Sequence, residues 1–339
     1  MPLDPSAKRL LDMLAAAGGM PDIAAMTPQQ MREGFRRLAR SVDLKGVPIG
    51  AIQDGELPGP GGALPYRLYT PQRPAARPLP ALVFFHGGGC VFGDIDTHDG
   101  LCRMLSAESG CAVISVGYRR APEHRFPAAV EDAYAATQWV ADHAAALGLD
   151  AGRIAVGGDS AGAGLAVVVS QMAAAHRGAA TGRGPRIALQ LLFCPVLDMR
   201  AETASRAAFA EGYFLDQATI DWMLGHYCAA GVDRDDPRLS PLRAPQFSGL
   251  PPAHIHTAEF DPMRDEGEAY AQALRRAGVP ARYTCHAGMI HYFYAMAGAI
   301  PAARTALKAA AAAMQDALVG GEITATGVGG ASMAPHKAK

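Results

Sequence analysis

Residues 153–162, Arg-Ile-Ala-Val-Gly-Gly-Asp-Ser-Ala-Gly, join a short apolar run to a turn of small residues around one serine. The run Arg153–Gly157 is typical of a buried strand, and Ala161–Met172 has the composition of a helix. A chain that passes directly from strand to helix leaves room only for small side chains beside the serine, as in the G-x-S-x-G pattern. The pattern predicts a nucleophilic Ser160, although serine is also a common helix N-cap.

Strand-like and helix-like segments alternate on both sides of this turn. Apolar runs typical of buried parallel strands lie at 81–85, 111–116, 154–156, 187–193, 253–257 and 282–285. Helical stretches lie at 127–146, 161–177, 265–277 and 301–318. Two alternating segments, 47–53 and 64–70, predict an antiparallel pair before them. This order predicts one α/β fold with a mostly parallel central sheet, helices on both faces and ligands bound at the carboxyl ends of the strands.

Three segments stand apart from the alternation. Residues 1–45 contain two helical stretches and no strand, which predicts either a simple packed helix pair or an N-terminal helical cap over a site. Residues 46–319 are the expected catalytic domain, and within it 199–250 is an insertion expected to contribute to the cap and pocket. Residues 320–339, rich in Gly, Ala, Thr and Ser, predict a flexible tail.

A glycine-rich loop, His86-Gly87-Gly88-Gly89, follows the predicted strand 81–85. Consecutive glycines let backbone N–H groups face a cavity without obstruction by side chains, as in the oxyanion sites that accompany a serine turn of this kind. A flexible turn or a phosphate-binding loop is the alternative, but no G-x-G-x-x-G or G-K-[ST] pattern surrounds it. The Ala161 N–H, at a helix start, offers a further donor to an anion.

A serine hydroxyl needs a base to take its proton, and the base needs an acid to orient it. Asp261 follows the predicted strand 253–257, and His291 follows the next strand, 282–285, which gives the order Ser, Asp, His along the chain. Asp198 and Asp265 are rival acids, and His286 is the nearest rival base. We expect Asp198 to be a helix cap or a surface carboxylate, and Asp265 to lie in the first turn of a helix.

The sequence resembles the hormone-sensitive-lipase-like carboxylesterases, the bacterial family IV esterases, over about 47–318. The resemblance rests on HGGG at 86–89, GDIDTHD at 93–99, YRRAPEHRFPAAVED at 118–132, GDSAG at 158–162, DPMRDEG at 261–267 and GMIH at 288–291. It implies an α/β-hydrolase fold with an N-terminal helical cap. It also implies a triad of Ser160, Asp261 and His291, with oxyanion donors at Gly87, Gly88 and Ala161.

The sequence departs from this family at two places. Cys90 stands where a bulky apolar residue is usual, and Tyr292 stands where glycine is frequent. The Cys90 thiol is expected either to obstruct the pocket when modified or to be an inert buried group. The side chains expected to line the pocket are Phe35, Cys90, Asp159, Tyr213, Phe214, Ile290 and Tyr292.

The resemblance implies hydrolysis of short- to medium-chain acyl esters through an acyl-enzyme, with no metal and no organic cofactor. A binding protein on an inactive hydrolase fold, as in the related plant gibberellin receptors, is one alternative, and an amidase or peptidase is another. All three expected triad residues are present, which favours catalysis.

Composition limits the partners and the compartment. The formal net charge of −1 gives no electrostatic basis for binding nucleic acid or an anionic membrane. Six cysteines without a C-x-x-C pair indicate a reducing, cytoplasmic location. The expected partner is a small-molecule ester. The family resemblance adds a homodimer through the last strand and helix, 281–287 and 301–318.

Overall fold

The computed structural model describes residues 2–16, 23–178 and 184–320. Its central sheet has eight strands in the order β1-β2-β4-β3-β5-β6-β7-β8. The first pairings, β1 with β2 and β2 with β4, are antiparallel, and all the others are parallel. The strands are β1 (Ala51–Gly59), β2 (Gly62–Thr70), β3 (Leu79–Phe85), β4 (Ala112–Val116), β5 (Leu149–Asp159), β6 (Ile187–Phe193), β7 (Ala253–Phe260) and β8 (Ala281–Ile290). The predicted α/β fold with a mostly parallel sheet is confirmed.

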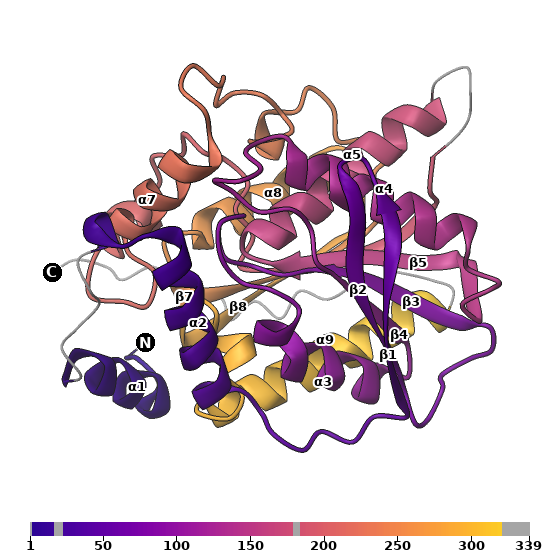
Figure 1. Cartoon of the computed structure of the whole chain (residues 1–339), viewed down its shortest axis with the longest axis horizontal. Coiled ribbons are helices and arrows are strands. Elements are labelled where there is room, and N and C mark those ends of the chain that lie inside the picture. Colours follow the sequence, from indigo (N-terminus) through magenta and orange to yellow (C-terminus); the bar gives the residue numbers. More distant parts are fainter. Residues whose placement is uncertain (1, 17–22, 179–183, 321–339) are drawn as a thin grey trace, which may run out of the picture.

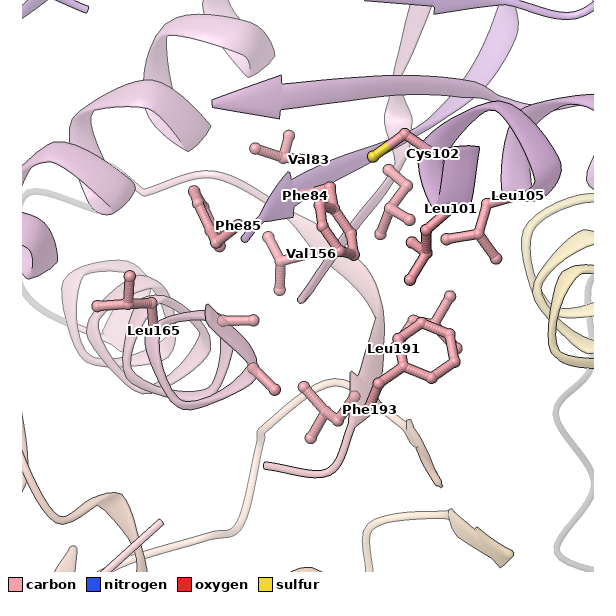
Figure 2. Packing of buried hydrophobic residues seen from close by; sticks show 14 of the residues in the cluster. Val83, Phe84, Phe85, Leu101, Cys102, Leu105, Val156, Leu165, Leu191 and Phe193 are labelled. Carbon is pink, nitrogen blue, oxygen red and sulfur yellow. The ribbon is translucent and has the colours of Figure 1, made fainter. Parts of the chain in front are cut away.

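Helices cover both faces of the sheet (Figure 1). On one face lie α3 (Asp99–Ser109) and α9 (Pro301–Val319), and on the other lie α4 (Ala128–Asp142), α5 (Ala161–Gly178) and α8 (Arg264–Arg276). Figure 2 shows Leu165 of α5 close to Phe85, while Leu101 and Leu105 of α3 lie on the other side near Phe84. Strand β3 is buried along its whole length, because both of its faces are covered.

Two groups of short helices lie beside this layered core. The N-terminal group consists of α1 (Pro5–Ala16), η1 (Ile23–Ala25) and α2 (Pro28–Val42). The insertion at 199–250 holds α6 (Ala204–Ala208), α7 (Gln217–Tyr227) and η3 (Pro241–Arg243). Figure 1 shows α2 and α7 on the same side of the molecule. The predicted tail at 320–339 lies, apart from Gly320, outside the described residues.

The sequence-based boundaries differ from the structure in several places. The first hairpin strand, predicted at 47–53, begins later and extends further, as β1 from Ala51 through Pro58 to Gly59. Helix α3 was not expected. The strand predicted at 282–285 extends to Ile290 as β8, which carries His286 inside the strand. Two further turns of 3-10 helix are η2 (Asp96–His98) and η4 (Phe293–Met296).

Candidate active site

Ser160 lies at a strained turn between β5 and α5. Its φ of +55° is a left-handed backbone conformation that side-chain-bearing residues seldom adopt. Gly158 and Gly162 make this turn possible, because a Cβ at either position would collide with the backbone carbonyl of Phe85. This backbone conformation costs of the order of 1–3 kcal/mol. It places Ser160 at the turn, outside both the strand and the helix.

Ser160, His291 and Asp261 form a continuous hydrogen-bonded chain. The Ser160 hydroxyl donates to His291 Nε2 at 3.0 Å, and His291 Nδ1–H donates to Asp261 Oδ2 at 2.8 Å. The backbone N–H of Met263 donates to Asp261 Oδ1 at 2.8 Å, so both carboxylate oxygens are engaged. The carboxylate therefore fixes the imidazole tautomer that leaves Nε2 free to accept a proton. The structure brings together the three residues expected from the sequence.

The electrostatics of His291 favour a base that is readily protonated. Burial by itself would lower the pKa of the imidazole. The charge and hydrogen bond of Asp261, assisted by the charge of Asp159, outweigh burial and hold the pKa above its ordinary value of 6.5. An imidazolium formed when Ser160 attacks is thus stabilised where it forms.

The glycine loop differs in one respect from the sequence-based expectation. The Gly87 N–H donates to His98 Nε2 at 3.2 Å, and Gly87 lines neither cavity at Ser160, so its expected role as an oxyanion donor is wrong. Gly88 and Gly89 line the outer cavity together with Ser160, and within the described residues their N–H groups bond to no other backbone or side-chain group. The donors available to an oxyanion are therefore the N–H groups of Gly88, Gly89 and Ala161.

His86 packs against this loop and supports it. Its ring stacks on Tyr118 with centroids 4.2 Å apart, and the Tyr118 hydroxyl donates to the His86 carbonyl at 2.7 Å. Burial, together with the neighbouring His98, lowers the pKa of His86 to about 3. His86 therefore remains neutral and acts as a packed support for the loop.

Two apolar cavities meet at Ser160. The inner cavity, of about 50 Å³, is lined mainly by α5, α7 and the residues after β6, including Ala161, Leu165, Val168, Val196, Met199, Arg206, Ile220, Leu224, Tyr227, Leu239 and Met263. The outer cavity, of about 220 Å³, is lined by the N-terminal helices and an aromatic group, including Ile23, Met31, Phe35, Leu38, Phe92, Phe214, His291 and Tyr292. Gly89, Ser160, Leu215 and Met223 border both cavities.

Five of the seven expected pocket residues line these cavities. Phe35, Asp159, Phe214 and Tyr292 border the outer cavity, and Cys90 borders the inner one. The expectation is wrong for Tyr213 and Ile290, which border neither. Tyr213 instead stacks on Phe260 with centroids 5.3 Å apart, and Ile290 is fully buried at the end of β8, where it pairs with Phe260.

The two departures from the family pattern have structural explanations. Tyr292 has φ +67°, a conformation for which glycine is normally preferred. Its hydroxyl donates to the Thr97 carbonyl at 2.8 Å and its ring stacks on Phe214, so these contacts offset the strain. Cys90 is buried and borders the inner cavity, and burial raises the pKa of its thiol to about 12, which favours the inert alternative without testing it.

The rival acids and base are engaged elsewhere. Asp198 Oδ1 accepts from Arg243 Nε at 2.9 Å, and Asp265 Oδ2 accepts from the Ser205 N–H at 2.8 Å. His286 bonds to His256 inside the sheet at 3.2 Å. Among the described residues, the one group spaced to ligate a metal is Cys194, Asp261 and His291, and two of its members are already bonded to each other.

The N-terminal helices are anchored directly to the catalytic loops. Arg32 of α2 is nearly buried and donates to the Val91 carbonyl at 2.9 Å and to the Ala121 carbonyl at 2.7 Å. Trp222 Nε1 of α7 donates to the Met26 carbonyl at 3.2 Å, which joins the insertion to the N-terminal segment. Side chains of α2 consequently form a fixed wall of the outer cavity.

The sequence did not identify Gly89, Met223, Leu215 or Phe92 as residues of the site. Gly89 was one of three consecutive glycines, and nothing in such a run shows which N–H groups face the serine. Met223 lies on a helix without a strong apolar face, and Phe92 lies in a loop. Only the packing of α7 and α2 over Ser160 brings their side chains to the cavities.

Comparison with known proteins agrees with this geometry. A family model described as the alpha/beta hydrolase fold matches residues 82–295. The carboxylic ester hydrolase LipN of Mycobacterium tuberculosis is 50% identical over 239 residues, covering 68% of this chain and 62% of that protein. The ethyl acetate hydrolase of Pseudomonas putida is 37% identical over 323 residues, covering 94% of this chain and 100% of that protein.

A solved structure gives the same result in three dimensions. The α/β hydrolase enzyme LAE6 from the metagenome of Lake Arreo, Spain, superposes with a TM-score of 0.87 at 42% identity, covering 92% of this chain and 98% of that chain. The resemblance to hormone-sensitive-lipase-like esterases, based on the sequence motifs, is confirmed. With this fold, this serine turn and these relatives, the chain belongs to the α/β hydrolase fold family.

Proposed function

We propose that this enzyme hydrolyses carboxylic esters through an acyl-enzyme on Ser160. The observation that carries the proposal is the unbroken Ser160–His291–Asp261 chain at the junction of two apolar cavities. Esterase relatives with the same fold support the reaction class. A binding protein on an inactive hydrolase fold does not require a complete triad in working geometry, so the catalytic alternative is favoured.

The steps follow from the atoms in the site. Ser160 Oγ attacks the ester carbonyl while His291 Nε2 takes the hydroxyl proton. The N–H groups of Gly88, Gly89 and Ala161 stabilise the oxyanion, each such donor being worth about 2.7–4 kcal/mol. His291 then protonates the departing alcohol, and a water molecule, deprotonated by the same nitrogen, releases the acid.

The position of His291 assigns the two halves of the ester to the two cavities. The leaving oxygen must receive its proton from Nε2, so the alcohol lies on the His291 side. His291 lines the outer cavity and not the inner one. The alcohol therefore occupies the larger, aromatic-lined outer cavity, and the acyl chain enters the smaller inner cavity. Esters of short acids with larger apolar alcohols fit this arrangement, and the expected medium-chain acids fit it less well.

A cytoplasmic location is part of the same proposal. All six cysteines are free, and four of them are buried, as suits a reducing compartment. Among the described residues, no helix is long and apolar enough to cross a membrane.

The triad acid can be tested against its rival. Asp261→Asn removes the charge that fixes the His291 tautomer, and kcat for p-nitrophenyl butanoate should fall about 10⁴-fold. The matched control Asp198→Asn alters a carboxylate that pairs with Arg243 and should lose far less. Circular dichroism checks that both variants fold. A collapse of activity in the control, with Asp261→Asn near normal, would reverse the assignment.

The pH profile tests the state of His291. Only the neutral imidazole accepts the serine proton, so kcat/KM should be full at high pH and fall as the pH drops through the pKa of His291. Because Asp261 holds that pKa above 6.5, the acid limb of the profile should lie above pH 6.5. An acid limb well below that value would mean that Asp261 does not stabilise the imidazolium.

We also propose that two copies associate through β8 and α9. Strand β8 lies at an edge of the sheet, and Thr284, Cys285 and Ala287 on it are exposed. Edge strands carry unpaired backbone groups that a second copy could cover. Light scattering at micromolar concentration should give twice the chain mass of 35.4 kDa. A monomer mass would contradict this interface. So would a dimer that persists in the variant Thr284→Pro.

A further inference from the structure

Two side chains outside the catalytic groups, Leu215 and Met223, border both cavities at the reacting serine. Of the four residues that border both cavities, Gly89 and Ser160 belong to the catalytic machinery, and Leu215 lies in the segment before α7. The fourth is Met223 of α7. Its Cβ, Cγ and Sδ lie against Gly89, in the space that a side chain at residue 89 would occupy. Met223 thus extends across the site to the oxyanion loop.

We propose that Met223 is the partition that limits the acyl chain to the inner cavity and so determines chain-length specificity. This inference rests on the proposed ester hydrolysis. With the alcohol beside His291, an acyl chain leaving Ser160 on the other side reaches a volume of about 50 Å³. A water-sized group needs about 10–15 Å³ of such volume, so the inner cavity holds roughly three to five of them. The smaller inner cavity therefore suits acetyl to butanoyl chains better than an octanoyl chain.

A buried ion pair forms part of the wall of the inner cavity. Arg206 borders this cavity, nearly buried, and its guanidinium pairs with Glu266 at 2.8 Å. Glu266 also accepts the Leu197 N–H at 2.7 Å and the Asp198 N–H at 2.9 Å, which fixes this part of the wall to α8. On the Gly89 side, the unbranched Met223 side chain lies between an acyl chain in the inner cavity and the outer cavity of about 220 Å³.

Variants of Met223 test the partition through a ratio of rates. Met223→Ala joins the two cavities over Gly89, so a long acyl chain can continue into the outer cavity. Each methylene newly buried favours kcat/KM by up to about fourfold. The ratio of kcat/KM for p-nitrophenyl octanoate to that for the butanoate should rise at least about tenfold. Met223→Leu keeps the volume and should leave the ratio within about threefold of the wild type.

Ile220→Ala is the matched control. Ile220 lies on the same helix and lines only the inner cavity, so shortening it enlarges that cavity without opening the partition. Ile220→Ala should raise kcat/KM for p-nitrophenyl hexanoate more than kcat/KM for the octanoate. Met223→Thr provides a second small residue if Met223→Ala does not fold. The partition would be overturned if the ratio of kcat/KM for the octanoate to that for the butanoate stayed unchanged in both Met223→Ala and Met223→Thr. It would also be overturned if Ile220→Ala raised this ratio equally.

A second series tests the assignment of the cavities. Phe214 lines only the outer cavity. Phe214→Ala should change the ratio of kcat/KM for benzyl butanoate to kcat/KM for methyl butanoate. Ile220→Ala should leave this ratio unchanged. The opposite pattern would place the acyl chain in the outer cavity and refute the proposal. If the wild type hydrolysed no ester of either series, the proposed function itself would fail. If the wild type hydrolysed these esters but the ratio of kcat/KM for the octanoate to that for the butanoate did not change in the Met223 variants, only the role of Met223 would be refuted.

Discussion

The close approach of the Phe85 carbonyl to the serine turn is the constraint on which the rest of the site depends. Gly158 and Gly162 permit it, and no residue with a Cβ could replace either without moving β3. The turn forces Ser160 to φ +55° and starts α5 immediately afterwards. Because β3 ends beside β5, the glycine loop and the Ala161 N–H come to the same place. The same close packing of β3 against the serine turn therefore positions both the nucleophile and the oxyanion donors.

Substrate selection comes from elements outside this core. The N-terminal helix α2 forms part of the wall of the outer cavity and the insertion helix α7 part of the wall of the inner one, while the reacting groups follow strands of the sheet. Arg32 fixes α2 to the loop after the glycines, and Arg206 with Glu266 fixes the insertion to α8.

The sequence predicted the fold and the three reacting residues because each depends on short local patterns at strand ends. Ser160, Asp261 and His291 each follow an apolar run directly, and the parallel sheet brings such ends together. The oxyanion donors were partly wrong, since the partner of the Gly87 N–H, His98, lies later in the chain at the end of η2. Tyr213 and Ile290 were misplaced because aromatic and apolar residues look alike in sequence whether they line a cavity or pack on Phe260. Helix α3 was missed although Leu101, Met104 and Leu105 recur at helical spacing.

The most direct measurement of the central claim is the chemical identity of the acylated residue. Rapid acid quenching of the enzyme during turnover of p-nitrophenyl butanoate, followed by mass spectrometry of its peptides, should find one butanoyl group per chain, on Ser160. Ser160→Ala should carry none and release no burst of p-nitrophenol. A butanoyl group on another residue, or full turnover by Ser160→Ala, would contradict the account.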